Sequence, residues 1–558
     1  MRNPHFKKYP LSHELLKYIS KTPTGNRTPY LINIVSPGLC DDAIQRLAPS
    51  LAKHRGCTII DINPGIGLWS SKLHDFLKPR SHILVELGQH TYLPFLQPLL
   101  DAPGSRYHYR CWPPVDAAYI GRYVEEGLLP AASESRGDQS PILLVANHGH
   151  GRVRAEDHSV GVEAVMQAYT HAYNFRHNKS FHTYGPTRML MWLADSDKRT
   201  LLPRTVAYRS KVAVALEMSM HVEEIIGGPP LETKARREDA LEIRSGERVA
   251  ERTKEEGLIL PPRRQLAYEG TFGRSSAGTT RDWHQELQEL EEGFKTLKYS
   301  QFEGELPKPL IDARSRKEPA RKGVPFTAEY KRFQRLKATF NRANVNHNKA
   351  DKYVQMQEEI DRLDLEAHHT DINSEERKEL FRVLDAKIRD FKASLEDLKE
   401  VDLQKIMFLD DDRRAFAMEP PLLMWDRRKA EPILAESDEF YHISKPMALL
   451  DFQPQPKSLQ DFPMNKKQED YFDDIATHLM SVRGPATLHH LNKLAPGAFE
   501  ALTSKVPALR DPRKGGRRDI DFVRNRTLTP KMFHGLALAW DQWLFKPADP
   551  RTYPSRHK

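Results

Sequence analysis

An acid, a glycine turn and a second acid form the part of the sequence best suited to bind a ligand. The apolar stretch TIIDI (58–62) contains Asp61 and is followed by a turn with Gly65 and Gly67. Glycines here let a ligand approach the backbone without a Cβ in the way, and the helix that follows adds partial positive charge. Glu86 lies about 20 residues beyond the turn, where a carboxylate can bind both hydroxyls of a ribose. This spacing predicts a nucleotide-cofactor pocket, and the alternative is a tight structural turn without a ligand.

The turn departs from the glycine pattern of dinucleotide-binding proteins. That pattern has a third glycine three residues after the second, and this sequence has Ser70 there. An acid before a Gly-x-Gly turn and another acid after the next strand resemble the S-adenosylmethionine-dependent methyltransferase fold instead. The resemblance implies a cofactor site formed by Asp61, Gly65, Gly67 and Glu86.

A further candidate site follows the apolar stretch PILLVAN (141–147). This stretch ends in Asn147, and the next residues are His148, Gly149 and His150. The strand is similar to one in rRNA adenine N6-dimethyltransferases, which ends in Asn-Leu-Pro-Tyr or a close variant. There the asparagine holds the adenine amino group and the aromatic ring stacks on the flipped base. We therefore interpret Asn147 as a vestigial catalytic and cofactor-binding residue, and His150 as the replacement of the stacking ring.

The acid that usually faces the cofactor adenine is also missing. In YHYRCWPPVD (107–116) its position is taken by Cys111, although Asp116 is nearby. Loss of this acceptor would weaken adenine recognition by about 0.5–1.5 kcal/mol, the net value of one hydrogen bond. The cofactor implied is S-adenosylmethionine, in a pocket that is either functional or vestigial. We predict no metal site, because the three cysteines lack metal-ligand spacing.

The elements around these residues alternate between strand-like and helix-like stretches. Short apolar stretches occur at 58–62, 82–87, 141–147 and 187–194, and helical patterns occur at 39–54, 70–78 and 159–173. Such alternation predicts βαβ units and a parallel sheet that is buried on both faces. The fold class is therefore α/β, a Rossmann-like S-adenosylmethionine-dependent methyltransferase domain with a mainly helical C-terminal domain.

The composition divides the chain into five segments. We expect a basic N-terminal segment at 1–27, a methyltransferase-like α/β domain at 28–227 and a mainly helical C-terminal domain with a basic tail at 411–558. Between the two domains, 228–326 is densely charged and too poor in large apolar residues to offset its ordering entropy, which predicts a largely disordered insertion. Residues 327–410 are expected to form a helical hairpin, with Asn373 and Glu376 in a variant of the capping box.

Apolar residues in 327–410 repeat at helical spacing. One stripe consists of Leu384, Ile388, Phe391, Leu395 and Leu398, and an earlier stripe consists of Tyr353, Met356, Ile360 and Leu363. A stripe of this kind either packs against the rest of the hairpin or binds a partner. We favour a self-packing core.

Charge and apolar content limit the classes of protein. The chain has 558 residues and a formal net charge of +9, which favours a polyanionic partner. No apolar run approaches the roughly 20 residues of a membrane span. The first 30 residues are basic, with one acid and a leucine-rich face, as in an amphipathic mitochondrial targeting segment. The other interpretation is a basic first helix of the folded domain, and the two are not exclusive.

Several separate motifs, in order, resemble the mitochondrial transcription factor B family of the fungal type, which descends from rRNA adenine dimethyltransferases. They include IIDINPGIGLWSS, HILVELGQHTYLPFL, LLVANHGHG and RMLMWLADSDKRTLLPRTVAYRSKVAVALE, and later PMALLDFQP, THLMSVRGPATLHHL and LTPKMFHGLALAWDQWLFKP. The resemblance covers most of 28–226 and 415–547. It implies an initiation factor of the mitochondrial matrix that helps the single-subunit mitochondrial RNA polymerase select and melt promoters and grips the melted strand.

A strand-gripping role requires basic or aromatic residues on the surface. Two groups are candidates: Arg204, Tyr208, Arg209 and Lys211 in LPRTVAYRSK, and Arg513, Lys514, Arg517 and Arg518 in DPRKGGRR. For each group the alternative is a solvated run of charges without a ligand.

Three functions are consistent with the sequence. The first is a transcription factor on a vestigial methyltransferase scaffold, with the polymerase and promoter DNA as partners. The second is an active methyltransferase of mitochondrial small-subunit rRNA, and the third is an RNA-binding protein of the mitochondrial ribosome. The replacement at His150 favours the first, because a methyltransferase of this class works by positioning the base.

Overall fold

The structure is a computed structural model that describes residues 8–19, 31–87, 89–113, 117, 119–131, 140–149, 159–227, 237–261, 264, 350–441, 447–482 and 484–547. The chain divides into two compact units. The first comprises 1–237, 248–268 and 411–558, and the second comprises 238–247 and 269–410. Asp116 and His150 lie outside the described residues, as does most of the predicted disordered insertion at 228–326.

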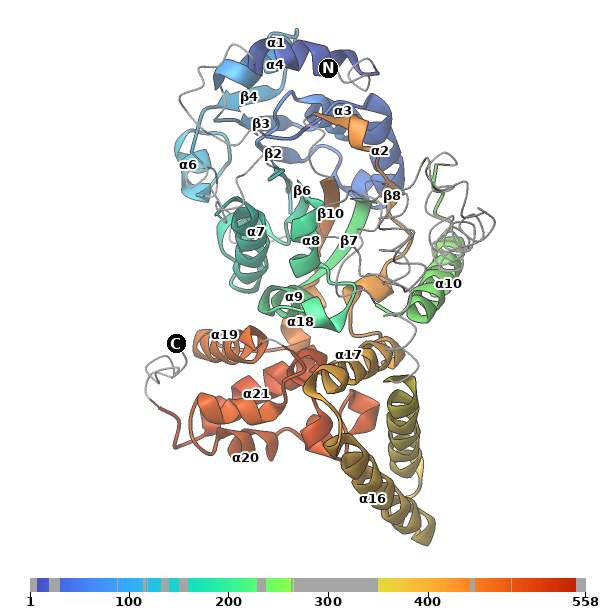
Figure 1. Ribbon diagram of the computed structural model, residues 1–558. Coiled ribbons are helices and arrows are strands. Elements are labelled where there is room, and N and C mark those ends of the chain that lie inside the picture. The colour runs from blue at the N-terminus through green and yellow to red at the C-terminus, as the bar shows by residue number, and fades with distance from the viewer. Residues whose placement is uncertain are drawn as a thin grey trace, which may run out of the picture. The chain divides into compact units, whose positions relative to one another are not determined.

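An eight-stranded sheet forms the centre of the first unit (Figure 1). Its order is β4 (Tyr107–Arg110), β3 (Ser81–Val85), β2 (Thr58–Ile62), β5 (Ile142–Asn147), β6 (Arg188–Ala194), β10 (Met447–Pro454), β7 (Met220–Gly227) and β8 (Ile433–Leu434). β4, β3, β2, β5 and β6 run parallel, and β7 is parallel to β8. β10 runs antiparallel to both of its neighbours.

This topology confirms the predicted fold class. The sheet is mainly parallel and has crossover helices, and its one long antiparallel strand, β10, lies between β6 and β7. This arrangement matches the Rossmann-like methyltransferase fold. The structure differs from the predicted division in two respects. The helix Asp239–Glu255 lies within the segment 228–326, which was predicted to be largely disordered. β10 belongs to the segment assigned to the C-terminal domain, yet it completes the sheet between β6 and β7.

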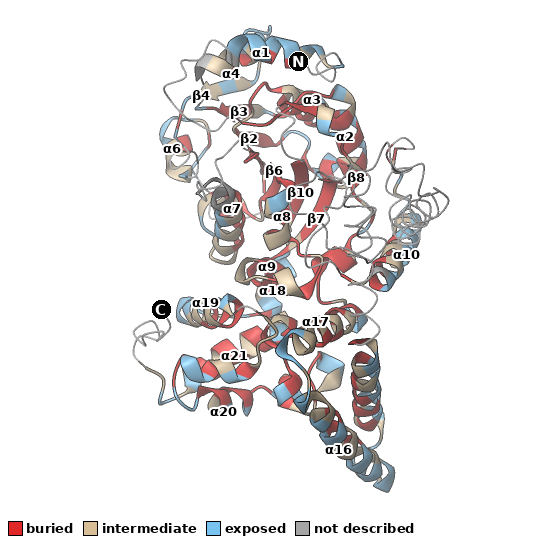
Figure 2. Ribbon diagram, in the orientation of Figure 1, coloured by how far each residue is buried: buried red, intermediate tan, exposed pale blue. Residues whose placement is uncertain are grey.

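Helices cover both faces of the sheet because its side chains alternate in direction. Ile59 faces α2 (Pro37–Leu51) and α3 (Leu68–Leu77), and its neighbour Ile60 faces α6 (Ile120–Glu125) and α7 (Ser159–Arg176). Both isoleucines are fully buried, and each such side chain contributes about 1.5–3 kcal/mol to folding. The strands therefore read as continuous apolar runs, and they form the buried centre seen in Figure 2.

Further helices flank this core. They are α1 (Pro10–Ile19), α4 (Gln89–Leu100), α8 (Asp195–Leu201) and α9 (Lys211–Glu217). The helix α10 (Asp239–Glu255) is divided between the two units. A separate two-stranded sheet pairs β1 (Asn33–Ile34) with β9 (Phe440–Tyr441). Among the described residues, none of the helices is both long enough and apolar enough to cross a bilayer.

The C-terminal part of the first unit is mainly helical, as predicted. It contains α18 (Pro456–Asp461), α19 (Lys466–Ser481), α20 (Ala498–Thr503) and α21 (Pro530–Gln542), and the last three share one apolar cluster with α9. Asn465 and Gln468 form a capping box that starts α19. This packing brings the end of α7 and part of α9 next to α19.

The second unit contains a helix at 350–369, α16 (Glu375–Glu396) and the start of α17 (Glu400–Ala417). The self-packing stripe is confirmed for Leu384, Ile388 and Phe391, which are all buried. The predicted cap is wrong by one residue. Ser374, not Asn373, accepts the hydrogen bond of a first-turn N–H, from Arg377.

Candidate functional site

The glycine turn after β2 has the backbone geometry that the sequence predicts, but the chain itself requires it. Gly65 has φ +58° and Gly67 has φ +74°. A Cβ on Gly65 would lie 2.1 Å from Oδ1 of Asn33, which accepts a hydrogen bond from the Ile66 amide at 3.0 Å. A Cβ on Gly67 would lie 2.7 Å from Leu96. Glycine at these positions is therefore explained without a ligand.

Glu86 directly follows β3 at the predicted position, yet its carboxylate faces into the protein. The side chain is 3% exposed, and Oε2 accepts a hydrogen bond from the Gly65 amide at 3.1 Å. The Tyr109 hydroxyl donates to the Glu86 backbone carbonyl at 2.9 Å. The group expected to bind a ribose thus holds the glycine turn against β3.

Asp61 is also used within the fold, and its partner explains the missing third glycine. Ser70 stands at the position of that glycine and donates to Oδ2 of Asp61 at 2.5 Å. His82 lies 3.4 Å from the same oxygen and stacks on His74 and Tyr107. Burial and the neighbouring His82 lower the pKa of His74 to about 4. Asp61 is therefore bonded to Ser70 of α3 and contacts a stack of rings that includes His74 of the same helix.

Asn147 ends β5 as predicted and is 5% exposed. Its Nδ2 donates to the Ile32 carbonyl at 3.0 Å, and its Oδ1 accepts from the Gly149 amide at 2.9 Å. The Asn147 carbonyl accepts from Nδ2 of Asn63 at 3.1 Å. The amide that would hold an adenine amino group instead fixes the segment before β1 to the end of β5.

The N-terminal helix contributes to the same region. Leu15 of α1 is fully buried in a cluster with Leu31, Ile66 and Tyr92, and this cluster includes the residue between the two glycines. Residues 10–19 therefore form a helix that packs on the folded domain.

In this structure the Glu86 carboxylate accepts the Gly65 amide through Oε2, and a Cβ at Gly65 would meet Asn33. A bound ribose would share this carboxylate with the Gly65 amide or displace it. Among the described residues, no group of three or more histidine, cysteine, aspartate or glutamate side chains has metal-binding geometry. Cys111, at the position of the adenine-facing acid, is exposed after β4.

The first predicted nucleic-acid group is largely internal. Arg209 is fully buried and binds Glu217 through two hydrogen bonds of 3.0 and 2.5 Å, and its Nη1 donates to the carbonyls of Arg526 and Leu528. The expected surface position is therefore wrong for Arg209. Arg204 lies over the Trp425 ring at 3.9 Å and 3.5 Å from Glu224.

Two members of this group are partly exposed. Tyr208 is half-buried at the end of a short 3-10 helix, Val206–Tyr208. Lys211 is half-buried and pairs with Asp473 at 2.9 Å. It also lies 4.9 Å from the Tyr169 ring, in contact with α19.

The second predicted group is divided between surface and interior. Arg513 and Lys514 are exposed, and both approach Asp511, at 3.0 and 3.7 Å. Arg517 is buried and donates to the Phe522 carbonyl at 3.1 Å, so its expected surface position is wrong. Arg518 is half-buried. The structure does not bring the two groups together by any described contact.

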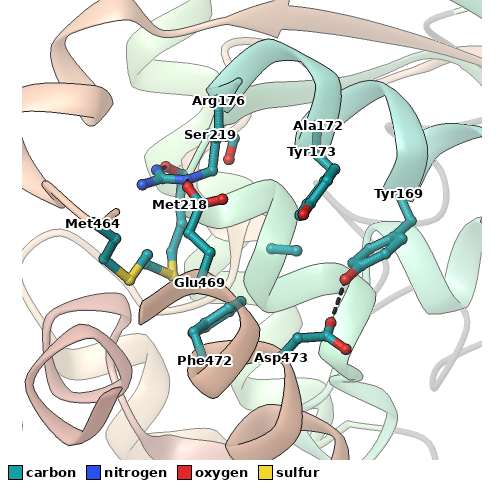
Figure 3. A pocket seen from close by; sticks show the side chains of 11 residues that line it. Tyr169, Ala172, Tyr173, Arg176, Met218, Ser219, Met464, Glu469, Phe472 and Asp473 are labelled. Atoms are coloured by element: carbon teal, nitrogen blue, oxygen red, sulfur yellow. Dashed lines mark hydrogen bonds and ion pairs between the residues drawn. The ribbon is translucent and has the colours of Figure 1, made fainter. Parts of the chain in front are cut away.

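Sequence reasoning missed a set of tyrosines and lysines where α7 meets α19. Tyr169 and Tyr173 line a small cavity with Phe472, Met218 and Ser219 (Figure 3). The Tyr169 hydroxyl donates to Asp473, and Lys466 contacts the Tyr173 hydroxyl. The available signal was the four-residue spacing of the two tyrosines on a helix, which places both rings on one face.

Comparisons with known proteins give little independent information. No protein-family model matches the chain, and no curated protein matches it. Among solved structures, the chain is similar to a dimethyladenosine transferase from Plasmodium falciparum, with 9% identity and a TM-score of 0.33 over 92% of this chain and 98% of that one. A likeness at this level carries no argument about function.

Proposed function

We propose that this chain is a mitochondrial transcription initiation factor built on a methyltransferase-like scaffold. It assists the single-subunit mitochondrial RNA polymerase in promoter recognition and melting, and its partners are the polymerase and the melted promoter strand in the matrix. Support comes from the ordered motifs that resemble fungal-type transcription factor B. In the structure these motifs fall on β2, β3, β5, β6 and α21.

One observation favours a factor over an enzyme. Both ends of the Asn147 side-chain amide are bonded to the backbone of the same chain, at Ile32 and Gly149. An adenine methyltransferase needs this amide free to orient the amino group of the base. Here the residue acts as a structural tie.

Reconstituted transcription tests the proposal. The cognate mitochondrial polymerase is assayed on a linear promoter template with and without the chain. A promoter-specific run-off product is expected only with the chain. On a template whose initiation region is already unpaired, the polymerase should need the chain much less, because melting is no longer required. Equal run-off from the duplex template without the chain would contradict the proposal.

An active rRNA adenine methyltransferase is the second candidate, because the glycine turn and Glu86 retain the positions of the fold. The test is transfer of labelled methyl groups from S-adenosylmethionine to an RNA hairpin that resembles the 3′ end of small-subunit rRNA. An active dimethyltransferase serves as positive control. We expect no transfer. Transfer that is lost in Asn147→Ala would favour the enzyme.

A further inference from the structure

Aromatic rings and lysines alternate along the surface where α7, α19 and the end of α21 meet. We name this set the tyrosine–lysine strip: Tyr169, Tyr173, Tyr471, Lys466, Lys467 and Lys546. Lys211, which the sequence predicted as a nucleic-acid contact, lies next to Tyr169 at one end of the strip.

The rings and cations are in close contact along the strip. Tyr169 and Tyr173 have ring centroids 6.4 Å apart and an interplanar angle of 25°. Lys466 lies 4.8 Å from the Tyr173 ring. The next residue, Lys467, lies 5.7 Å from the Tyr471 ring, which Lys546 also approaches, at 5.9 Å. The three tyrosines are half-buried, so each is held in place with part of its surface accessible.

The charges of the strip are only partly neutralised. Asp473 pairs with Lys211, and Asp470 pairs with Lys466 at 2.5 Å. Within the part of the chain that the structure describes, neither Lys467 nor Lys546 has a carboxylate partner, and Lys546 donates to the backbone carbonyls of Asp541 and Trp543. Lys467 therefore remains available for a phosphate, and Lys546 keeps one N–H for a phosphate.

The strip continues into an exposed apolar turn. After α21, Phe545 is 82% exposed and directly precedes Lys546. A large exposed ring beside a cation offers water-exposed apolar surface that a base can cover, as in proteins that bind single strands by stacking. Phe545, Lys466 and Lys467 are exposed, and Tyr471 and Lys546 are half-buried.

The cavity behind the strip is too small to accept a base. Its volume is about 30 Å³, enough for one or two water molecules but not for a nucleobase. Ser219 lines it, and its buried hydroxyl has no hydrogen-bond partner among the described residues, which suits a bound water (Figure 3). A nucleic-acid strand would therefore stack on the outer faces of the rings.

We propose that the tyrosine–lysine strip binds single-stranded nucleic acid, with bases stacked on Tyr471 and Phe545 and phosphates held by Lys467 and Lys546. We identify this nucleic acid as the melted promoter strand, and that identification rests on the proposed function. The strip replaces the buried Arg209 and Arg517 as the principal contact.

Fluorescence anisotropy with the full chain tests the strip directly. The probes are a labelled mixed-sequence DNA 16-mer, its duplex and the RNA 16-mer of the same sequence. The single strands should bind more tightly than the duplex. Tyr471→Leu keeps apolar volume but loses the aromatic face, and it should weaken single-strand binding by about tenfold. Tyr471→Phe keeps the ring and should bind as the wild type does.

Salt dependence separates phosphate contacts from general charge effects. Lys467→Gln should lower the slope of log affinity against log salt by about 0.7, the value for one phosphate on a single strand. Lys505→Gln removes an exposed lysine of the C-terminal helical part and should leave the slope unchanged. Tyr471→Leu binding within twofold of the wild type, or equal slopes for both lysine variants, would overturn the proposal.

The outcome is separable from that of the proposed function. If the polymerase initiates equally well without the chain but Tyr471→Leu still weakens binding to the oligonucleotide, the strip stands and the transcription role fails. A preference for the RNA probe would keep the strip and move its ligand to rRNA. If Tyr471→Leu impairs transcription and capture of the polymerase but binds the DNA 16-mer normally, the strip is a protein-docking surface and the proposal fails.

Discussion

The glycine-turn region and the tyrosine–lysine strip use polar groups in opposite ways. At the glycine turn, Asp61, Glu86 and Asn147 are all buried and bonded to other parts of the chain. On the strip, Lys467 and Lys546 rest on an aromatic ring without a described carboxylate partner. A buried polar group must find its partner within the fold, whereas an exposed cation on a ring keeps its capacity for a ligand. The residues that resemble an enzyme site therefore contribute to the fold, and the surface that we propose for strand binding uses other residues.

The largest loss of stability is expected at Arg209. This residue is buried and bonded within the chain, although the sequence analysis placed it on the surface. Arg209→Ala would leave the buried Glu217 carboxylate and two carbonyls without their donor. We expect a loss of about 3–5 kcal/mol in the free energy of unfolding, measured by urea denaturation. Lys211→Ala, at a partly exposed pair, should cost less than about 1 kcal/mol. Similar losses for both variants would erase the distinction between them.

Gly65→Ala tests whether the turn is filled by the chain. The left-handed backbone at Gly65 costs a Cβ-bearing residue about 1–2 kcal/mol, and the buried Asn33 would have to move as well, for a total near 3 kcal/mol. Gly56→Ala is the matched control, with φ +74° and nothing within 4 Å of its Cβ, so only the backbone cost should be seen. Equal thermal unfolding shifts would indicate open space at Gly65.

Asn147→Ala tests whether the Asn147 side chain stabilises the fold or binds a cofactor. Loss of both side-chain bonds leaves the Ile32 carbonyl and the Gly149 amide without that partner, at a cost of about 2 kcal/mol. Calorimetry of the wild type with S-adenosylmethionine is the companion measurement. We expect no binding heat and no rise in the unfolding temperature. A rise that vanishes in the variant would restore Asn147 as a cofactor residue.

The smallest effect concerns pH. The pKa of His74 is lowered to about 4 in the folded protein, so the unfolded chain binds this proton more readily. The contribution of His74 to stability is therefore complete above about pH 6.5 and declines as the pH falls towards 4. His74→Phe keeps a ring for the stack on Tyr107 but removes the titration. From pH 7.5 to pH 5, the unfolding free energy of the wild type should fall relative to that of His74→Phe by under about 1 kcal/mol. No change across this range would contradict the assignment.

Local patterns in the sequence identified the elements but not their long-range partners. The stretch 58–62 was predicted with its observed bounds, because an apolar β-branched run between turn residues encodes a strand locally. Arg209 was misplaced because its partners include carbonyls more than 300 positions away, at Arg526 and Leu528. The place of 447–454 in the sheet was missed for the same reason.

The candidate site shows the same limit. The positions of Gly65, Gly67, Glu86 and Asn147 at strand ends followed from spacing, and the structure has them there. Whether a carboxylate points to a ligand or to a neighbouring amide depends on the side-chain rotamer, which the sequence does not give. Ser70 was noted only as a missing glycine, although it is the residue that binds Asp61.

The position of β10 constrains how the protein is made. β6 and β7 are finished well before Met447 leaves the ribosome, and until then each has an unpaired edge that only β10 covers. Open edges of buried, apolar strands are prone to pair with other chains. The more than 200 residues between β7 and β10 therefore have to be synthesised before these two strand edges can be paired.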